Sequence, residues 1–200
     1  MQAAERNDAD AQNRLGNRYY NGDGVTKDYL EAVKWYKKAA EQGNATAQNN
    51  LGDCYYYGKG VTQDYSEAIK WYRMAAEQED ARSIYSLGCS YYFGTGVDVD
   101  IDKAFQYFKK ASELGDLEAQ VALADCYMEG EGVNKDYNKA VKWYKMAAEQ
   151  GNAQAQYNLG KCYYYGRGVT QDYTEAVKWY KKAAEQGNAQ AQHNLGNCYY

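Results

Sequence analysis

The chain has 200 residues, and 23 Lys and Arg stand against 27 Asp and Glu, which gives a formal net charge of −4. This balance argues against nucleic acid as the main partner, because phosphate binding needs clustered Lys and Arg. No apolar run approaches the about 20 residues that a membrane span needs, so no membrane insertion is expected.

A 36-residue pattern fills the chain, with Leu in one column and Val in another: Leu15, Leu51, Leu87, Leu123, Leu159 and Leu195, and Val25, Val61, Val97, Val133 and Val169. Repeats of this length are pairs of helices that bury their apolar faces by stacking. The sequence predicts one array over residues 1–200. Its parts are the end of a preceding repeat at 1–8, full repeats at 9–44, 45–80, 81–116, 117–152 and 153–188, and a partial repeat at 189–200.

The first element of each repeat is a helix, here called helix A, which is expected to end before residue 22. Ala11, Leu15 and Tyr19 follow the i, i+4, i+8 spacing of one apolar helix face. Gly16 lies beside that face and recurs in four other repeats. Because Gly inside a helix costs up to about 1 kcal/mol relative to Ala, its recurrence predicts a close helix crossing.

A glycine loop at residues 22–25 follows helix A. Gly22 can adopt the left-handed conformation after the last helical turn, and Val25 is expected to fold back as an apolar plug. Asp28 is the predicted N-cap of the second helix, helix B, and Glu31 is expected to complete a reciprocal capping box. The third and fourth repeats keep the Asp but have Lys in place of the Glu.

Helix B has apolar residues at i, i+3, i+4, i+7 and i+8, which predicts a wide apolar stripe: Ala32, Trp35, Tyr36, Ala39 and Ala40. Gly43 is expected to end helix B and Asn44 to cap the next helix A. At the second junction Glu79 takes the place of this Gly. A residue other than Gly is strained in the left-handed conformation, so a slightly different turn is expected there.

The repeat resembles the Sel-1-like repeat, a relative of the tetratricopeptide repeat with a longer loop, in the pattern A-x-A-Q-x-x-L-G-x-x-Y-Y-x-G-x-G-V-x-x-D-Y-x-x-A-x-x-W-Y-x-x-A-A-x-x-G-N. The match covers nearly the whole chain. The resemblance implies an all-α fold, a right-handed α-solenoid of antiparallel helix pairs. It also implies a non-catalytic role as a scaffold or adaptor for protein–protein interaction.

Four cysteines share one column of the repeat: Cys54, Cys126, Cys162 and Cys198. A fifth, Cys89, is displaced from this column by one residue. Equivalent positions in stacked helices lie about 9–10 Å apart. This spacing exceeds the about 7 Å between Cα atoms that a disulfide tolerates and is too wide for a zinc site. The sequence predicts reduced, partly buried thiols and no metal. The alternative is a redox-active or crosslinking thiol at Cys89, which is expected on the exposed side of its helix.

The sequence predicts no enzyme and no cofactor. No Ser is followed three residues later by Lys, the arrangement of class A serine β-lactamases, and no phosphate-binding G-x-x-x-x-G-K loop occurs. His193 is the single His and is expected on the surface. Two alternatives to the scaffold stay open, a weak β-lactam-binding or hydrolase-type repeat protein, as for some bacterial relatives, and a passive spacer within a larger protein.

The resemblance implies that helix A lines the concave side, where repeat proteins bind their partners. A helical wheel with Leu15 in the core places the columns of residues 13, 17, 20 and 21 away from it. The candidate residues for binding a protein or peptide partner are therefore Asn49, Asp53, Tyr57, Tyr85, Phe93, Val121, Asp125, Tyr157, Lys161 and Tyr165. The aromatic residues are of the kind enriched in binding hot spots, although packing against the neighbouring repeat would explain them too.

Asn50, Asn158 and Asn194 form a further column at the edge of this predicted groove. Their amides can pair with the backbone of an extended peptide, because they offer donors and acceptors. They can equally bond to neighbouring loops. The pattern also indicates that the chain is cut within repeats at both ends, at Ala3 to Glu5 and at Tyr199-Tyr200. Since solenoids need polar capping repeats, end-to-end self-association at high concentration is expected.

Overall fold

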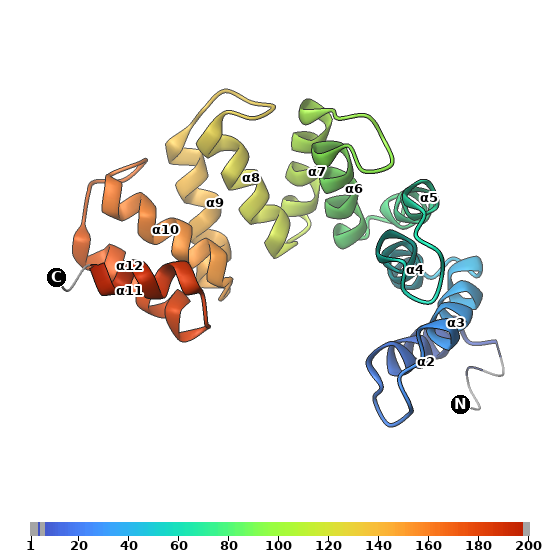
Figure 1. Cartoon of the computed structure of the whole chain (residues 1–200). Coiled ribbons are helices and arrows are strands. Elements are labelled where there is room, and N and C mark those ends of the chain that lie inside the picture. The colour runs from blue at the N-terminus through green and yellow to red at the C-terminus, as the bar shows by residue number, and fades with distance from the viewer. Residues whose placement is uncertain (1–3, 5–6, 198–200) are drawn as a thin grey trace. The chain divides into compact units, whose positions relative to one another are not determined.

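The computed structural model describes residue 4 and residues 7–197, and every regular element within them is an α-helix (Figure 1). The elements are α2 (Ala9–Asn21), α3 (Tyr29–Glu41), α4 (Ala45–Tyr57), α5 (Tyr65–Ala76), α6 (Ala81–Phe93), α7 (Ile101–Glu113), α8 (Leu117–Glu129), α9 (Tyr137–Glu149), α10 (Ala153–Tyr165), α11 (Tyr173–Glu185) and α12 (Ala189–Asn197). Ala3, Glu5, Cys198, Tyr199 and Tyr200 lie outside the described residues.

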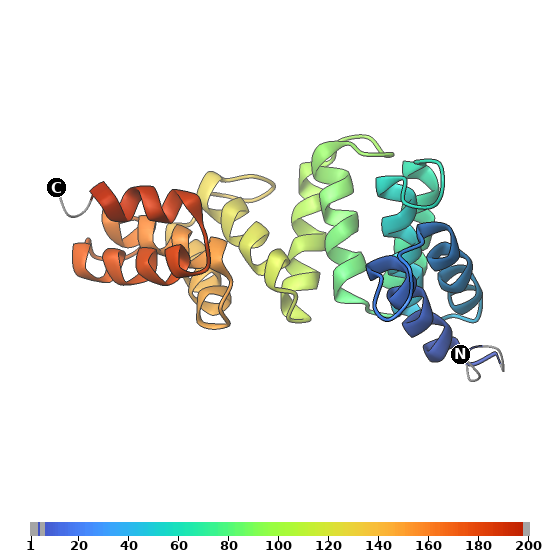
Figure 2. The ribbon, with the colours of Figure 1, turned by 60° about the horizontal axis from the view of Figure 1, so that its bottom comes forward.

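The chain divides into two compact units, residues 1–100 and residues 101–200, which are described separately. The even-numbered helices from α2 to α12 are helices A, and the odd-numbered helices from α3 to α11 are helices B. In unit 1, α3 packs against both α2 and α4, and α5 packs against both α4 and α6. In unit 2, α9 and α11 lie between successive helices A in the same way (Figures 1 and 2). The chain is therefore an all-α solenoid of helix pairs, as the sequence predicts.

The glycine in helix A allows the close crossing of the two helices in a pair. A Cβ atom on Gly16 would lie 2.5 Å from the Tyr36 ring of helix B, and one on Gly52 would lie 2.6 Å from the Tyr72 ring. Real Cβ atoms do not approach other atoms so closely. The close crossing expected from this column of glycines is therefore confirmed at Gly16, Gly52 and Gly160.

The loop after helix A contains two glycines with separate roles. Gly22 has a φ of 87° and ends α2 as expected, with its N–H donating to the Arg18 carbonyl at 2.8 Å. In the following repeat the second loop glycine is Gly60. A Cβ added to it would lie 2.2 Å from the carbonyl oxygen of Tyr29, in helix B of the preceding repeat. The loop tip therefore touches a neighbouring backbone, which was not predicted. Val61 is half-buried against the core beside it, as the plug interpretation expects.

Each helix B begins at the predicted Asp, but the capping box does not close. Asp28 accepts from the Glu31 N–H at 3.0 Å, while its own N–H donates to the carbonyl of Tyr19 at 2.9 Å. The Glu31 carboxylate pairs with Lys34 instead. The prediction of a reciprocal bond is therefore wrong, because helix A already satisfies that N–H. This also explains why Asp136 caps α9 equally well without the Glu.

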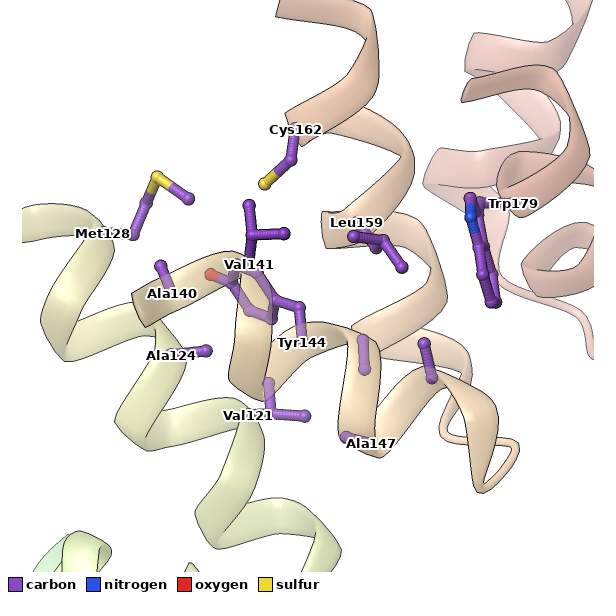
Figure 3. Close-up of a cluster of buried hydrophobic side chains, with 12 residues drawn as sticks. Val121, Ala124, Met128, Ala140, Val141, Tyr144, Ala147, Leu159, Cys162 and Trp179 are labelled. Carbon is purple, nitrogen blue, oxygen red and sulfur yellow. The ribbon is translucent and has the colours of Figure 1, made fainter. Parts of the chain in front are cut away.

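The core of each unit lies between successive helix pairs. Ala32, Tyr36, Ala39 and Ala40 are buried as the helix B stripe predicts, and Trp35 is half-buried against the preceding cluster. Figure 3 shows the corresponding cluster of unit 2, where side chains of α8, α9 and α10 meet. Its labelled members include Val121, Ala124, Met128, Val141, Tyr144, Leu159 and Cys162.

The junction at Glu79 differs less than expected. Glu79 adopts the left-handed conformation with a φ of 61°, and α5 ends already at Ala76. The Asp80 N–H still donates to the carbonyl of Ala75 at 3.2 Å, which matches the bond from Asn44 to Ala39 at 3.1 Å. The turn therefore keeps its hydrogen bonds and places a non-Gly residue in a strained conformation.

Within the described part of the chain, no helix combines the length and the apolar character that crossing a membrane requires.

Candidate functional site

The structure places the ten candidate residues in three different environments. Tyr57, Phe93 and Tyr165 are mostly exposed, at 61%, 68% and 58%. Asp125 is also exposed, and a second group is half-buried: Asp53, Tyr85, Tyr157 and Lys161. Asn49 and Val121 are buried, at 1% and 6% exposure.

The column of Asn49 and Val121 does not point away from the core, which corrects the helical-wheel prediction. The next helix A covers this column. Asn49 on α4 donates to Ser83 on α6 at 2.9 Å, and Val121 on α8 belongs to the cluster that includes Leu159 of α10. A wheel built on a single helix cannot include this second neighbour. These two residues are therefore packing residues between helices A.

Buried tyrosines of helix B form the floor of a recurring polar site. The hydroxyl of Tyr36 donates to Asn17 at 2.8 Å, and that of Tyr72 donates to Asp53 at 2.8 Å. Tyr144 donates to Asp125 in the same way. Burial raises the pKa of all three phenols well above their ordinary value, so each hydroxyl remains a hydrogen-bond donor.

In unit 1 this site is a pocket over Tyr36, between the first two helices A, that encloses about 560 Å³ of space open to solvent. It is lined by Asn17, Tyr20, Asn21, Tyr36, Asn50, Asp53 and Arg82. Arg82 of α6 pairs with Asp53 of α4 at 2.9 Å. Burial raises the pKa of Asp53, while the bonds from Tyr72 and Arg82 oppose this rise.

In unit 2 the corresponding pocket lies over Tyr144, between α8 and α10, and encloses about 400 Å³ of space open to solvent. It is lined by Asp125, Met128, Glu129, Tyr144, Asn158, Lys161, Cys162, Tyr165 and Arg167. Met128, Tyr144 and Cys162 are labelled in Figure 3 and come from three different helices. The two pockets therefore use the same columns of the repeat with different side chains.

The asparagine column bonds to the preceding helix A and not to loops. Asn50 donates to Asn13 at 3.0 Å and to Asn17 at 3.2 Å, and Asn158 donates to Asp125 at 3.4 Å. The expectation of bonds to neighbouring loops is thus wrong for these two residues. Asn194 lines a further pocket with Tyr164, Tyr165 and Tyr180.

Exposed aromatic rings stand at the ends of three helices A, and one of them, Tyr165, lines the pocket of unit 2. Tyr57, Phe93 and Tyr165 each end a helix A, and each packs edge-to-face against the aromatic residue just before it, with ring centroids 4.9 Å apart. Such contacts hold a ring in one orientation while most of its surface stays in water. Tyr157, by contrast, packs against Tyr180 at 5.9 Å.

The cysteines that the structure describes are free thiols. Cys54, Cys126 and Cys162 are buried, and burial raises their pKa values to about 12, 12 and 11. Because the thiolate is the reactive form, these three are inert packing residues near neutral pH. Cys89 is half-buried.

A ladder of buried glutamines is a feature that the sequence interpretation missed. Gln48 donates to the carbonyl of Ala40 in the preceding repeat at 3.1 Å and accepts from Gln78 at 2.8 Å. Gln156 does the same with Ala148 and Gln186, at 3.1 and 2.8 Å. The repeated motif Ala-x-Ala-Gln is the sequence signal for these bonds, because it places one amide in an otherwise apolar helix face in each of several repeats.

Comparison with known proteins identifies a family and several relatives of this chain. The family model described as Sel1 repeat matches residues 9–44, 45–80, 81–116, 117–152, 153–188 and 189–200. A Sel1 repeat protein from Oxalobacter formigenes is 46% identical, with a TM-score of 0.92 over 96% of this chain and 79% of that one. No curated protein matches the sequence significantly.

Two further solved structures are similar over most of the chain. The protein c5321, a protective antigen present in uropathogenic Escherichia coli strains, is 42% identical with a TM-score of 0.87. The match covers 98% of this chain and 42% of c5321, so the chain spans less than half of that relative. The immunity protein Pa5087 from Pseudomonas aeruginosa is 26% identical with a TM-score of 0.65, over 92% of this chain and 67% of that one.

Proposed function

This chain belongs to the Sel1 repeat family, and from that premise we propose that it is a non-catalytic scaffold that holds a protein or peptide partner against its helices A. The exposed aromatic rings of Tyr57, Phe93 and Tyr165 carry this proposal. Each is fixed by its neighbour, and aromatic residues of this kind dominate binding energies at protein interfaces. Asn49 and Val121 are left out of the proposed surface because they are buried.

The pocket of unit 1 adds hydrogen-bonding chemistry suited to a peptide backbone. Asn17 uses its oxygen to accept from Tyr36 and Asn50, and Asn50 uses its nitrogen to donate to Asn13 and Asn17. Among the residues that the structure describes, Nδ2 of Asn17 and Oδ1 of Asn50 keep no partner. A peptide group needs one acceptor and one donor. The two free amide atoms therefore supply a complementary pair.

Selection of a displayed library of random 12-residue peptides on the immobilised chain tests the proposal. The test variant is Tyr57→Ala/Phe93→Ala/Tyr165→Ala, which removes the three exposed rings of helices A. The matched control is Leu30→Ala/Met74→Ala/Met146→Ala, which removes three exposed apolar side chains of helices B. Enriched peptides are expected to bind the unchanged chain and the control, and to bind the test variant at least about tenfold more weakly.

Two outcomes contradict the proposal. Peptides that bind all three proteins equally would place the site away from the three exposed rings of helices A. Failure to enrich any peptide would favour a passive spacer. Circular dichroism of the test variant shows whether it is folded, and the exposed positions of the three rings make large losses of stability unexpected.

A further inference from the structure

The pocket of unit 2 contains four charged side chains, and its two acidic residues are already engaged. Asp125 accepts from the hydroxyl of Tyr144 and from Nδ2 of Asn158, the latter at 3.4 Å. Glu129 lies 3.9 Å from the ammonium group of Lys135. Asp125 therefore bonds to two neutral donors and also lies in the field of Lys161, which opposes the rise that burial causes in its pKa, while Glu129 faces a cation outside the pocket lining.

The two cations of the same pocket have no directly paired carboxylate among the residues that the structure describes. Within residue 4 and residues 7–197, no carboxylate lies within 4.0 Å of the charged groups of Lys161 or Arg167, although both residues line the pocket. Each cation rests on an aromatic ring. Lys161 lies 5.5 Å from the centroid of Tyr157, and Arg167 lies 5.4 Å from that of Tyr165. Such contacts orient a cation without neutralising it.

Both cations also act on a common point. Lys161 and Arg167 each oppose the rise that burial causes in the pKa of the Cys162 thiol, and Asp125 adds to that rise, so the fields of both cations and of this carboxylate reach the thiol at the wall of the pocket. An anion seated in the pocket would meet both fields as well. Bonds between ionised groups are stronger than neutral ones, and Arg presents a fork that fits a carboxylate.

Among the residues that line the corresponding pocket of unit 1, Arg82 is the only cation and it is paired. Lys59, at the place of Arg167, lies outside that lining and rests on the Tyr29 ring. Asp53 occupies the place of Lys161, and its charge is paired with Arg82 at 2.9 Å. The two pockets share the tyrosine floor and the asparagine, so the charge difference is not a requirement of the fold. It marks the pocket of unit 2 as the one whose lining cations form no ion pair within 4.0 Å among the described residues.

We propose that the pocket formed by Lys161, Arg167 and Tyr165 binds an acidic side chain, Glu or Asp, of a partner segment that lies along helices A of unit 2. This inference rests on the proposed function and names the chemistry that unit 2 selects. The carboxylate sits between the two cations on the α10 side of the pocket. The exposed ring of Tyr165 packs against the apolar part of the same segment.

Titration of the full ¹⁵N-labelled chain with three blocked tripeptides at low salt tests the inference by NMR. The probes are acetyl-Gly-Glu-Gly-amide, acetyl-Gly-Gln-Gly-amide and acetyl-Gly-Lys-Gly-amide. The Glu peptide is expected to shift amide signals around residues 158–167, and the Gln peptide to bind at least about tenfold more weakly. Unblocked triglycine, with its free terminal carboxylate, distinguishes a side-chain site from a chain-end site.

Variants connect the shifts to the two cations. Lys161→Met/Arg167→Met is expected to abolish the response to the Glu peptide. The control Lys142→Met/Lys145→Met removes two exposed Lys of α9 with the same change in net charge and is expected to respond like the unchanged chain.

Specific outcomes overturn the inference. Stronger shifts with the Lys peptide would assign the pocket to a basic residue held by Asp125 and Glu129, and equal shifts with Glu and Gln would remove the role of charge. No shift with any of the probes would also overturn it. Because the peptide selection described above does not depend on acidic residues, its success would preserve the scaffold function even then.

Discussion

The two pockets over Tyr36 and Tyr144 occupy the same columns of the repeat, yet their charges differ. In unit 1 the pocket presents amides, and its Asp53 is paired with Arg82. In unit 2 it presents Lys161 and Arg167 without carboxylate partners among the described residues. The buried tyrosine and the asparagine above it are common to both. The frame of the pocket thus belongs to the fold, and its variable positions are where binding specificity can differ between units.

The largest expected effect comes from removing a loop contact between repeats that occurs in both units. Gly60→Ala would place a Cβ 2.2 Å from the Tyr29 carbonyl, and Gly168→Ala would place one 2.3 Å from that of Tyr137. Each variant combines a backbone clash with an unfavourable left-handed conformation, so each is expected to lose about 3 kcal/mol of stability. Urea unfolding followed by circular dichroism measures the loss.

Gly24→Ala is the matched control for these two variants. Gly24 has a φ of 69°, close to the 75° of Gly60, but an added Cβ would meet the flexible end of Arg18 and no backbone atom. A loss of about 1 kcal/mol is expected, from the backbone conformation alone. Equal losses for Gly24→Ala and Gly60→Ala would contradict the role given to the contact between repeats.

The next effect sharpens the difference between the pocket floors. Tyr144→Phe removes a hydrogen bond to the carboxylate of Asp125, and Tyr36→Phe removes one to the amide of Asn17. A bond to a charged group contributes more than a neutral one, so losses of about 2 and about 1 kcal/mol are expected. Thermal unfolding of both variants provides the measurement. A larger loss for Tyr36→Phe would contradict the stronger hydrogen bond assigned to Tyr144 and Asp125.

Much of the structure of each repeat can be predicted from the sequence, because it depends on residues close together in the chain. The cap at Asp28, the left-handed Gly22 and the stripe around Tyr36 all depend on spacing within one helix or turn. The burial of Asn49 could not be predicted in this way, since it depends on α6, a helix of the next repeat. The pairing of Asp53 with Arg82, and the lack of such a partner for Lys161, likewise depend on distances between repeats.

The junctions between repeats give a smaller contrast. Glu79 in unit 1 adopts the left-handed conformation that Gly151 adopts in unit 2, with φ values of 61° and 94°. Glu79→Gly is expected to stabilise the chain by about 1 kcal/mol, and Gly151→Ala to destabilise it by a similar amount. Since no atom lies within 4 Å of a Cβ at Gly151, the second variant isolates the backbone conformation. Urea midpoints that move in the same direction for both variants would contradict this account.

The smallest effect concerns pH and separates the two pocket carboxyls. Burial raises the pKa of Asp53 above the about 3.9 of an unfolded Asp, so the folded chain holds this proton to higher pH than the unfolded chain does. Asp53 therefore contributes stability that is present below pH 4 and lost as pH rises through its folded pKa. Asp53→Asn is expected to reduce this decline in unfolding free energy between pH 4 and pH 7.

Asp125→Asn is the comparison in unit 2. Desolvation also raises the pKa of Asp125, against the hydrogen bond from Tyr144 and the charge of Lys161, but more of this residue's surface is exposed than that of Asp53, so water screens its charge more. Its removal should therefore change the pH slope less than Asp53→Asn does. Unfolding free energies at several pH values in one buffer system provide the test, and an equal or larger change at Asp125 would show that burial does not distinguish the two pockets.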